Sequence, residues 1–317
     1  MYIALKIINF DYYFEAITSP LGFAIEANIK SRGWILCGQS DLDYFEPKFN
    51  MGIKSEWEII KSIDLKKILR TELKLKPVII DTEPLFIDYY HHIGVGIGMP
   101  HTITILDYNE TQNSVLIYDK LSPNTMDKNK EGFFWISLEV FNKAFENRLY
   151  FLKYQLSSTD LNWEKEFFEL IKQSYINMRK TVSREFINMQ ALGIEGIKTF
   201  SETIRYFDPN YYDDSLTIWL FTNRIPIYIA QSVLGNRYIF TKAFEKTFHN
   251  RQFNFIDETI LALKEVMQKW VNLRKTFIKT GNGELNFENL ADELLEIAYT
   301  EEKLSFTLEN FYMSNCK

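Results

Sequence analysis

The sequence has few of the residues that most often bind metals or form disulfides. Only two cysteines, Cys37 and Cys316, and four histidines occur among its 317 residues. Neither cysteine belongs to a metal-binding spacing. We therefore expect a reduced chain without a metal centre, and we place it in the cytoplasm.

The sequence also lacks an excess of positive charge and a long apolar run. It has 36 lysines and arginines against 42 aspartates and glutamates, so its net charge is −6, which does not attract nucleic acid or anionic lipid. No apolar run approaches the roughly 18 residues that span a bilayer. The N-terminal stretch MYIALKIINFDYYFEAI lacks the pattern of a secretory signal. We expect neither a nucleic-acid partner nor a membrane.

What is present is typical of a folded globular protein with two domains. Apolar residues make up 46% and charged residues 25% of the chain, which is long enough for two cores. We predict an α+β fold, with a mixed α+β domain over residues 1–155 and an all-helical domain over residues 156–317. In the second domain, apolar spacing and glycine breaks predict helices at 163–190, 195–207, 213–232, 237–249, 256–279 and 286–312.

Three segments of the first domain have clear local patterns. We expect a helix over residues 13–31. Apolar residues at helical spacing predict a second helix over residues 55–76, where Ser55 and Glu58 resemble a capping box. Residues 76–86, KPVIIDTEPLF, are typical of a buried strand that is closed by Pro84.

Residues 100–122, PHTITILDYNETQNSVLIYDKLS, predict a β-hairpin with a polar turn at 109–113. Its open end has His101 on the first strand and Asp119 on the second. An imidazole that acts as a general base needs a third group to fix its tautomer and stabilise its cation, and residues at the open end of a hairpin face each other. Counting from the turn pairs His101 with a residue slightly beyond Asp119. A catalytic pair and two structural polar residues both fit this pattern.

The surroundings of the hairpin indicate no cofactor. The histidines and aspartates near it are His91, His92, His101, Asp81 and Asp88. Such side chains suit zinc or iron, but adjacent histidines on an extended segment point in opposite directions. The glycine-rich residues 94–98 are followed by a proline and a strand, whereas a dinucleotide-binding turn opens a helix.

Two further features are assigned to packing. Cys37 follows the apolar run GWIL, where a thiol is buried and unreactive rather than activated. Trp270 and Arg274 lie one helical turn apart and predict a stack at the surface. The other aromatic residues of the helical half fall at core spacing.

Residues 76–119 resemble the centre of the butirosin biosynthesis protein H N-terminal domain family. They share with it a Lys-Pro-Val strand, an aromatic loop, Pro-His before an apolar strand, a turn, and a strand that ends in Asp. Residues 14–34, FEAITSPLGFAIEANIKSRGW, resemble the first helix of the family. Residues 189–204, MQALGIEGIKTFSETI, resemble part of its helical C-terminal region.

This resemblance implies a papain-like domain related to bacteriocin-leader peptidases. The family uses a Cys-His-Asp arrangement to move an acyl group from a carrier-protein thioester to an amine in antibiotic or nonribosomal-peptide pathways. His101 and Asp119 match its histidine and aspartate. Where the family has its cysteine, this sequence has Tyr13 or its neighbour Tyr12. A phenol, with a pKa of about 10, is a poor replacement for a nucleophilic thiol.

Two functions follow from these residues. The first is an acyltransferase, or amide synthase, in which His101 oriented by Asp119 deprotonates the amine and Tyr13 donates to the oxyanion. Its partners would be an acyl or peptidyl carrier protein with a phosphopantetheinyl thioester, a small-molecule amine, and a second copy or a paralogue. The second is a pseudoenzyme that serves as a binding or partner module because the cysteine is missing. Hydrolysis through Cys37 ranks last.

Overall fold

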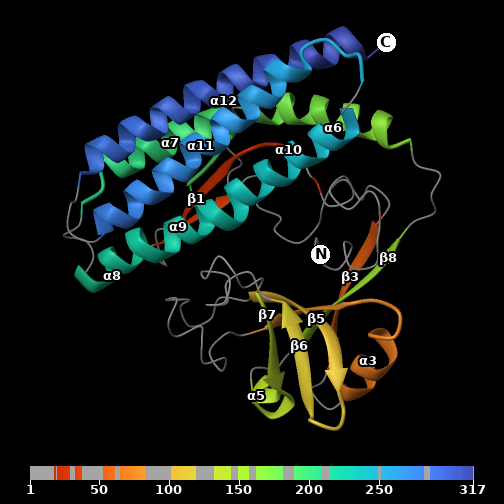
Figure 1. The fold of residues 1–317 in the computed structure, drawn as a ribbon. Coiled ribbons are helices and arrows are strands. Elements are labelled where there is room, and N and C mark those ends of the chain that lie inside the picture. The colour runs from red at the N-terminus through yellow and green to blue at the C-terminus, as the bar shows by residue number, and fades with distance from the viewer. Residues whose placement is uncertain are drawn as a thin grey trace. The chain divides into compact units, whose positions relative to one another are not determined.

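The computed structural model describes residues 18, 20–28, 33–37, 53–60, 65–82, 101–118, 132–143, 149–156, 162–180, 189–208, 214–248, 251–281 and 286–316. They belong to two units, each of which is treated by itself. The described residues between 53 and 156 form a sheet with two short helices, and the others form a mainly helical unit (Figure 1). The predicted α+β class is therefore correct.

The sheet unit consists of antiparallel strands, and the order of its described strands is β3-β8-β4-β5-β6-β7. The strands are β3 (Ile53–Ile60), β4 (Val78–Thr82), β5 (His101–Asn109), β6 (Ser114–Tyr118), β7 (Phe133–Ser137) and β8 (Leu149–Leu156). The helices are α3 (Leu65–Glu72) and α5 (Leu138–Lys143). The predicted hairpin is confirmed as β5 and β6, and the predicted buried strand as β4.

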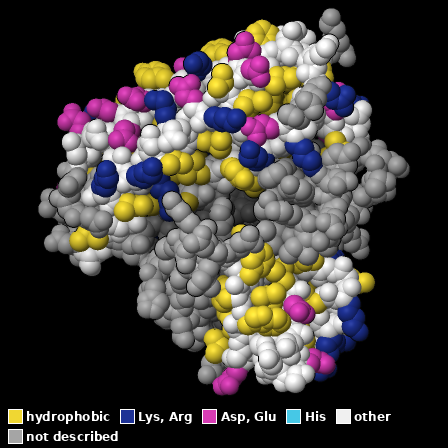
Figure 2. Space-filling view, viewed as in Figure 1, with side chains coloured by type: hydrophobic (Ala, Val, Ile, Leu, Met, Phe, Trp, Pro, Cys, Tyr) yellow, Lys and Arg dark blue, Asp and Glu magenta, His cyan; other side chains and the backbone are white. Residues whose placement is uncertain are grey.

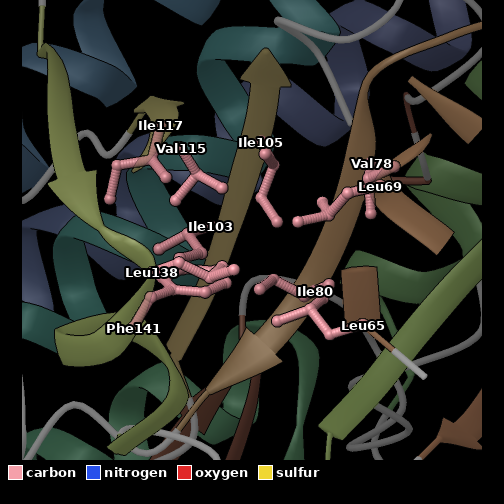
Figure 3. Close-up of a cluster of buried hydrophobic side chains, with 10 residues drawn as sticks. All are labelled: Leu65, Leu69, Val78, Ile80, Ile103, Ile105, Val115, Ile117, Leu138 and Phe141. Carbon is pink, nitrogen blue, oxygen red and sulfur yellow. The ribbon is translucent and has the colours of Figure 1, made fainter. Parts of the chain in front are cut away.

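One face of this sheet forms an apolar core with both helices. Strands β4, β5 and β6 contribute alternate residues, because successive side chains of a strand point to opposite faces, and α3 contributes two residues one turn apart. Figure 3 shows these side chains pointing toward a common centre. They are Leu65, Leu69, Val78, Ile80, Ile103, Ile105, Val115, Ile117, Leu138 and Phe141.

A β-bulge adjusts the pairing of β5 with β6. The register shifts between Ile105 and Asp107, so Leu106 is the extra residue on β5. Beyond the bulge, Tyr108 packs against the same core as Ile105. If residues 105–108 alternated regularly, with Leu106 in the ladder, Tyr108 would turn to the face opposite that of Ile105. The bulge therefore keeps both ends of a nine-residue strand in phase with the core.

The turn of the hairpin depends on two asparagines. Asn109 Oδ1 accepts a hydrogen bond from the backbone N–H of Gln112 at 3.0 Å. Asn113 has a φ of 50°, a left-handed conformation that asparagine tolerates better than most residues. The carbonyl of Asn113 then accepts from the N–H of Leu138 at 2.7 Å, which ties the turn to the start of α5.

The helix predicted over residues 55–76 is wrong in its first part. Residues 53–60 form β3, which pairs along its length with β8, and only Leu65–Glu72 is helical. Ser55 and Glu58 lie opposite Tyr154 and Phe151 in the ladder, so they form no capping box. Pairing with β8 satisfies the backbone of this segment, and such tertiary pairing overrides a local helical pattern.

The helical unit is built from long helices that lie side by side (Figure 1). The described helices are α6 (Trp163–Met178), α7 (Gly193–Arg205), α8 (Asp214–Trp219), α9 (Ile225–Tyr228), α10 (Gly235–Phe248), α11 (Ile256–Gly281) and α12 (Phe287–Asn315). None of the helices described is both long and apolar enough to cross a membrane.

Helices α8, α9 and α10 follow one another along a single line (Figure 1). They are joined by two π-helical segments, η5 (Leu220–Arg224) and η6 (Ile229–Leu234), so residues 214–248 run without a break. Pro226 lies at the start of α9. It has no N–H to donate to the carbonyl four residues back, and its ring crowds that carbonyl. The widened π-turn before Pro226 accommodates both the missing hydrogen bond and the proline ring.

The helical unit also contains strands, contrary to the prediction of an all-helical domain. Strands β1 (Ala24–Asn28), β2 (Gly33–Cys37) and β9 (Met189–Leu192) form a sheet in the order β2-β1-β9. The helix predicted over residues 13–31 is therefore wrong at β1, which has an antiparallel partner on each side. These pairings assign β1 and β2 to the helical unit instead of the domain predicted over residues 1–155.

Residues just before β1 are fixed in the core of the helical unit. The N–H of Leu21 donates to Ser174 Oγ of α6 at 2.9 Å, and the carbonyl of Phe23 accepts from the N–H of Gly193 at 2.7 Å. The ring of Phe23 stacks on Trp270 of α11 with centroids 5.7 Å apart. Contacts with several helices therefore hold this short segment.

Candidate functional site

His101 is the first residue of β5, and its backbone pairs with Thr82 of β4. On the other side of β5, the last described residue of β6 is Tyr118, which pairs with Thr104. The end of β5 that carries His101 is therefore also the end at which β6 stops, as the hairpin prediction requires. Figure 1 shows β5 and β6 side by side in the sheet.

Several predicted site residues lie outside the described residues. Asp119 follows Tyr118 directly in the sequence but is not described, and the same holds for Tyr13. His91, His92 and Asp88, which were considered as metal ligands, also lie outside. Within the part of the chain that the structure describes, no three histidine, cysteine, aspartate or glutamate side chains are grouped to hold one metal ion.

The charged groups described on the hairpin lie near its turn. Glu110 forms an ion pair with Arg70 of α3, and both side chains are more than half exposed. Asp107 Oδ1 accepts a hydrogen bond from the backbone N–H of Tyr108 at 2.7 Å. These contacts stabilise the turn and the bulge, at the opposite end of β5 from His101.

Cys37 lies in a different unit from His101. It is the last residue of β2, and its backbone pairs with Ala24 of β1 in the helical unit, whereas His101 belongs to the sheet unit. Cys37 therefore ends the strand Gly33–Cys37, and the burial of its thiol stays a prediction. Cys316 is exposed at the C-terminal end of α12.

A buried polar network in the helical unit was not predicted from the sequence. Arg237 of α10 donates from Nε to Glu301 Oε1 at 2.5 Å, and the same oxygen accepts from Trp270 Nε1 at 2.8 Å. All three residues are at most 1% exposed. The guanidinium carbon of Arg237 lies 5.6 Å from the centroid of the Trp270 ring, which adds a cation–π contact.

This network reaches the segment that precedes β1. Arg237 Nη2 donates to the carbonyl of Gly22 at 3.3 Å, and Trp270 stacks on Phe23. The network thus joins α10, α11 and α12 to residues 22 and 23, directly before β1. It does not form an open site, because its members are buried.

The predicted surface stack of Trp270 with Arg274 is wrong. Trp270 is fully buried, and its aromatic face meets Arg237 instead. Arg274 donates from Nε to the carbonyl of Pro226 at 3.1 Å, and burial lowers the pKa of its guanidinium. A one-turn spacing places two residues on one side of a helix, but whether that side is exposed depends on the other helices.

One signal in the sequence does point to the network. The buried positions of α12 recur every three or four residues, and Glu301 occupies one of them between Ala298 and Leu304. A glutamate at a core position needs a buried cation or donor. This periodicity identifies Glu301 as unusual, although it does not identify its partners.

Comparison with known proteins does not assign a family. No family model matches the chain, and none of the curated proteins matches it. The functional hypothesis therefore depends on the residues of the β5–β6 hairpin and on the resemblance that they carry.

Proposed function

We propose that this protein transfers an acyl group from a carrier-protein thioester to an amine, with His101 as general base and Asp119 as the carboxylate that orients it. The supporting observation is the register of β5 and β6. Because Tyr118 pairs with Thr104, continuing the ladder by one residue sets position 119 opposite Ile103. Asp119 would then be a diagonal neighbour of His101 on the same face, about 7–8 Å away and within reach of long side chains.

The bulge at Leu106 supports this proposed pairing, because it sets the register between β6 and the first part of β5. The hairpin closes with Asn109 paired to Ser114. In a regular ladder counted from that pair, position 119 would lie opposite Thr104 and hence on the other face from His101. Continued past Tyr118 with the register that the bulge sets, the ladder would bring position 119 opposite Ile103, and positions 101 and 119 would share a face.

The proposed reaction is a direct aminolysis. His101 accepts a proton from the attacking amine, the new C–N bond forms, the thioester C–S bond breaks, and the proton passes from the imidazolium to the leaving thiolate. Asp119 stabilises the imidazolium, and the Tyr13 hydroxyl donates to the oxyanion of the tetrahedral intermediate. A papain-like arrangement of the sheet unit belongs to the same proposal.

The test uses a short acyl thioester of N-acetylcysteamine as donor and hydroxylamine as acceptor, and measures hydroxamate formation. His101→Ala should lower the rate by roughly 10²–10⁴, and Asp119→Asn should lower it as well. Asp107→Asn, on the same strand but near the turn, is the matched control and should retain the wild-type rate.

The competing function is a non-catalytic partner module, for which the missing family cysteine argues. If wild type and His101→Ala bind an acyl-carrier protein with equal affinity and neither forms product from its thioester, catalysis is rejected in favour of that function.

A further inference from the structure

Residues 20–25 lie inside the helical unit, although they are far from its helices in the sequence. All of them are buried, whereas the surface of the unit in Figure 2 carries charged side chains of both signs. The unit consists of residues 14–51 and 160–317, and the residues between these two ranges belong to the sheet unit. The helices therefore contact a segment to which they are joined only through a separate part of the chain.

Two buried side chains bind the backbone of this segment. The N–H of Leu21 donates to Ser174 Oγ at 2.9 Å, and Ser174 Oγ donates in turn to the carbonyl of Leu170 at 2.7 Å. The carbonyl of Gly22 accepts from Arg237 Nη2 at 3.3 Å. Ser174 is 0% and Arg237 is 1% exposed. Because buried polar side chains need partners, these two residues recognise main-chain groups of the segment.

The same segment leads into a strand that completes a sheet of the helical unit. Strand β1 pairs with β9 over four residue pairs, and the carbonyl of Phe23 accepts from the N–H of Gly193 at 2.7 Å. Figure 1 shows β1, in red, beside α7, which follows β9. Addition of a strand to a sheet is a common way in which one chain binds another, because main-chain hydrogen bonds supply the affinity.

The side chain of Phe23 makes the binding specific. Its ring stacks on Trp270 and on Phe200, with centroids 5.7 Å and 6.5 Å apart. Helix α7 has a glycine, Gly196, where the ring approaches. A Cβ at Gly196 would lie 3.1 Å from Phe23 Cδ1 and 2.8 Å from the carbonyl oxygen of Ala191. The lack of a side chain on Gly196 thus lets both the ring and β9 lie close to α7. Contacts with single side chains of this kind give strand addition its sequence preference.

We propose that the helical unit binds residues 18–37 as a ligand, which a separate chain can supply. The recognised class is an extended apolar segment that presents a main-chain N–H and carbonyl at Leu21 and Gly22, then a phenylalanine, and then the strands β1 and β2. The covalent connection through residues 38–159 only raises the effective concentration of this segment. The hydrogen bonds, the strand pairing and the Phe23 contacts remain when that connection is cut.

Cleavage of the full chain between β2 and β3 tests whether the connection is needed. A recognition sequence for a specific protease, inserted among residues 41–48, allows the folded protein to be cut there. The two pieces should co-elute in gel filtration, and their far-UV circular dichroism should equal that of the uncut chain. Separation of the pieces without denaturant would refute the proposal.

A synthetic peptide shows which residues hold the pieces together. Residues 1–13 belong to the sheet unit and offer the N-terminal piece a second place of attachment, which a labelled peptide of residues 18–37 lacks. The cleaved protein is unfolded in urea and diluted into buffer that contains an excess of this peptide. The peptide should replace the corresponding part of the N-terminal piece and co-elute with the C-terminal piece.

Substitutions in the peptide leave the protein itself unchanged. Phe23→Asp should weaken binding of the peptide at least about a hundredfold, because it removes the ring contacts and sets a charge at a buried position. Lys30→Ala is the matched control, because Lys30 lies between β1 and β2 in the sequence, and this peptide should bind as the unsubstituted one does. No incorporation of the unsubstituted peptide, or equal incorporation of the Phe23→Asp peptide, would overturn the proposal.

Discussion

Arg237 of α10 and Glu301 of α12 form an ion pair whose side chains are each 1% exposed. The free energy needed to remove two charges from water can exceed the free energy gained from their attraction. The burial of this pair is therefore not by itself evidence that it stabilises the fold. Glu301 Oε2 is buried and has no hydrogen-bond partner among the described residues. We interpret the pair as a contact that specifies how the helices pack. It fixes α10 against α12 and, through the carbonyl of Gly22, orders the segment before β1.

The first prediction concerns this pair. Glu301→Gln should destabilise the helical unit by about 3–5 kcal/mol, because it leaves the buried Arg237 without a counter-charge. Urea unfolding followed by circular dichroism measures the change. The double variant Arg237→Met/Glu301→Leu should be more stable than Glu301→Gln, since it leaves no charge unpaired.

The matched control for that prediction is an exposed ion pair. Arg205 Nη2 pairs with Asp292 at 2.6 Å, but the Asp292 side chain is 63% exposed. Asp292→Asn should therefore change the free energy of unfolding by less than about 1 kcal/mol. Equal losses for Asp292→Asn and Glu301→Gln would contradict the assignment of Glu301 to a buried network.

The second prediction compares two glycines. Gly193, the first residue of α7, has a φ of 60°, and a Cβ there would lie 2.5 Å from the carbonyl oxygen of Met178. Gly193→Ala should lower the free energy of unfolding by at least about 1 kcal/mol. At Gly235, a Cβ would meet its nearest neighbour, the carbonyl oxygen of Ala230, at 3.7 Å. Gly235→Ala should be neutral or stabilising, because alanine favours a helix. A lower melting temperature for Gly235→Ala than for Gly193→Ala would contradict this prediction.

The third prediction tests the bulge. Deleting Leu106 should leave the unit folded, because Ile105 keeps its partner Ile117 and Asp107 keeps Leu116 in a ladder that becomes regular. Deleting Leu116 instead removes a paired residue and should unfold the sheet unit, because the buried positions of β6 lose their phase. Hydrogen exchange of the β5 amides distinguishes the two variants. Similar loss of protection in both would show that Leu106 is required for the fold.

The fourth prediction concerns the pH dependence of stability. Burial disfavours the charge on Glu245, but hydrogen bonds from Lys242 and Lys264 outweigh it and hold the pKa of Glu245 below its usual range. Because the folded pKa lies below the unfolded one, this stabilisation is present above the unfolded pKa near 4.5 and is lost as the pH falls through the folded value.

Glu245→Gln should therefore lower the free energy of unfolding at pH 7, by less than about 1 kcal/mol, and should have little effect at pH 3. Denaturant titrations at the two pH values measure the difference. Glu258→Gln is the control, because Glu258 is exposed on α11 and forms no ion pair among the described residues. A loss for Glu245→Gln that is the same at both pH values would contradict the assigned lysine contacts.

Local patterns in the sequence were sufficient to predict a helix or strand wherever a segment had one dominant periodicity. The alternation in residues 100–122 predicts the β5–β6 hairpin, because strands with one buried face alternate in sequence. The apolar run within residues 76–86 predicts β4. The long apolar repeats of α11 and α12 likewise predict both helices nearly to their ends. The bulge at Leu106 was not predicted, since an extra residue shows only when the partner strand is known.

What the sequence alone determined is the α+β class, the hairpin with His101 at its open end, and the periodic helices of the second half. Only the tertiary structure decided that β1 and β2 pair with β9, that residues 53–60 extend along β8, and that Arg237 meets Glu301. The physical reason is that these outcomes depend on partners distant in the chain. A strand forms where another backbone satisfies its N–H and C=O groups, and a charge can be buried only where its counter-charge is brought to it.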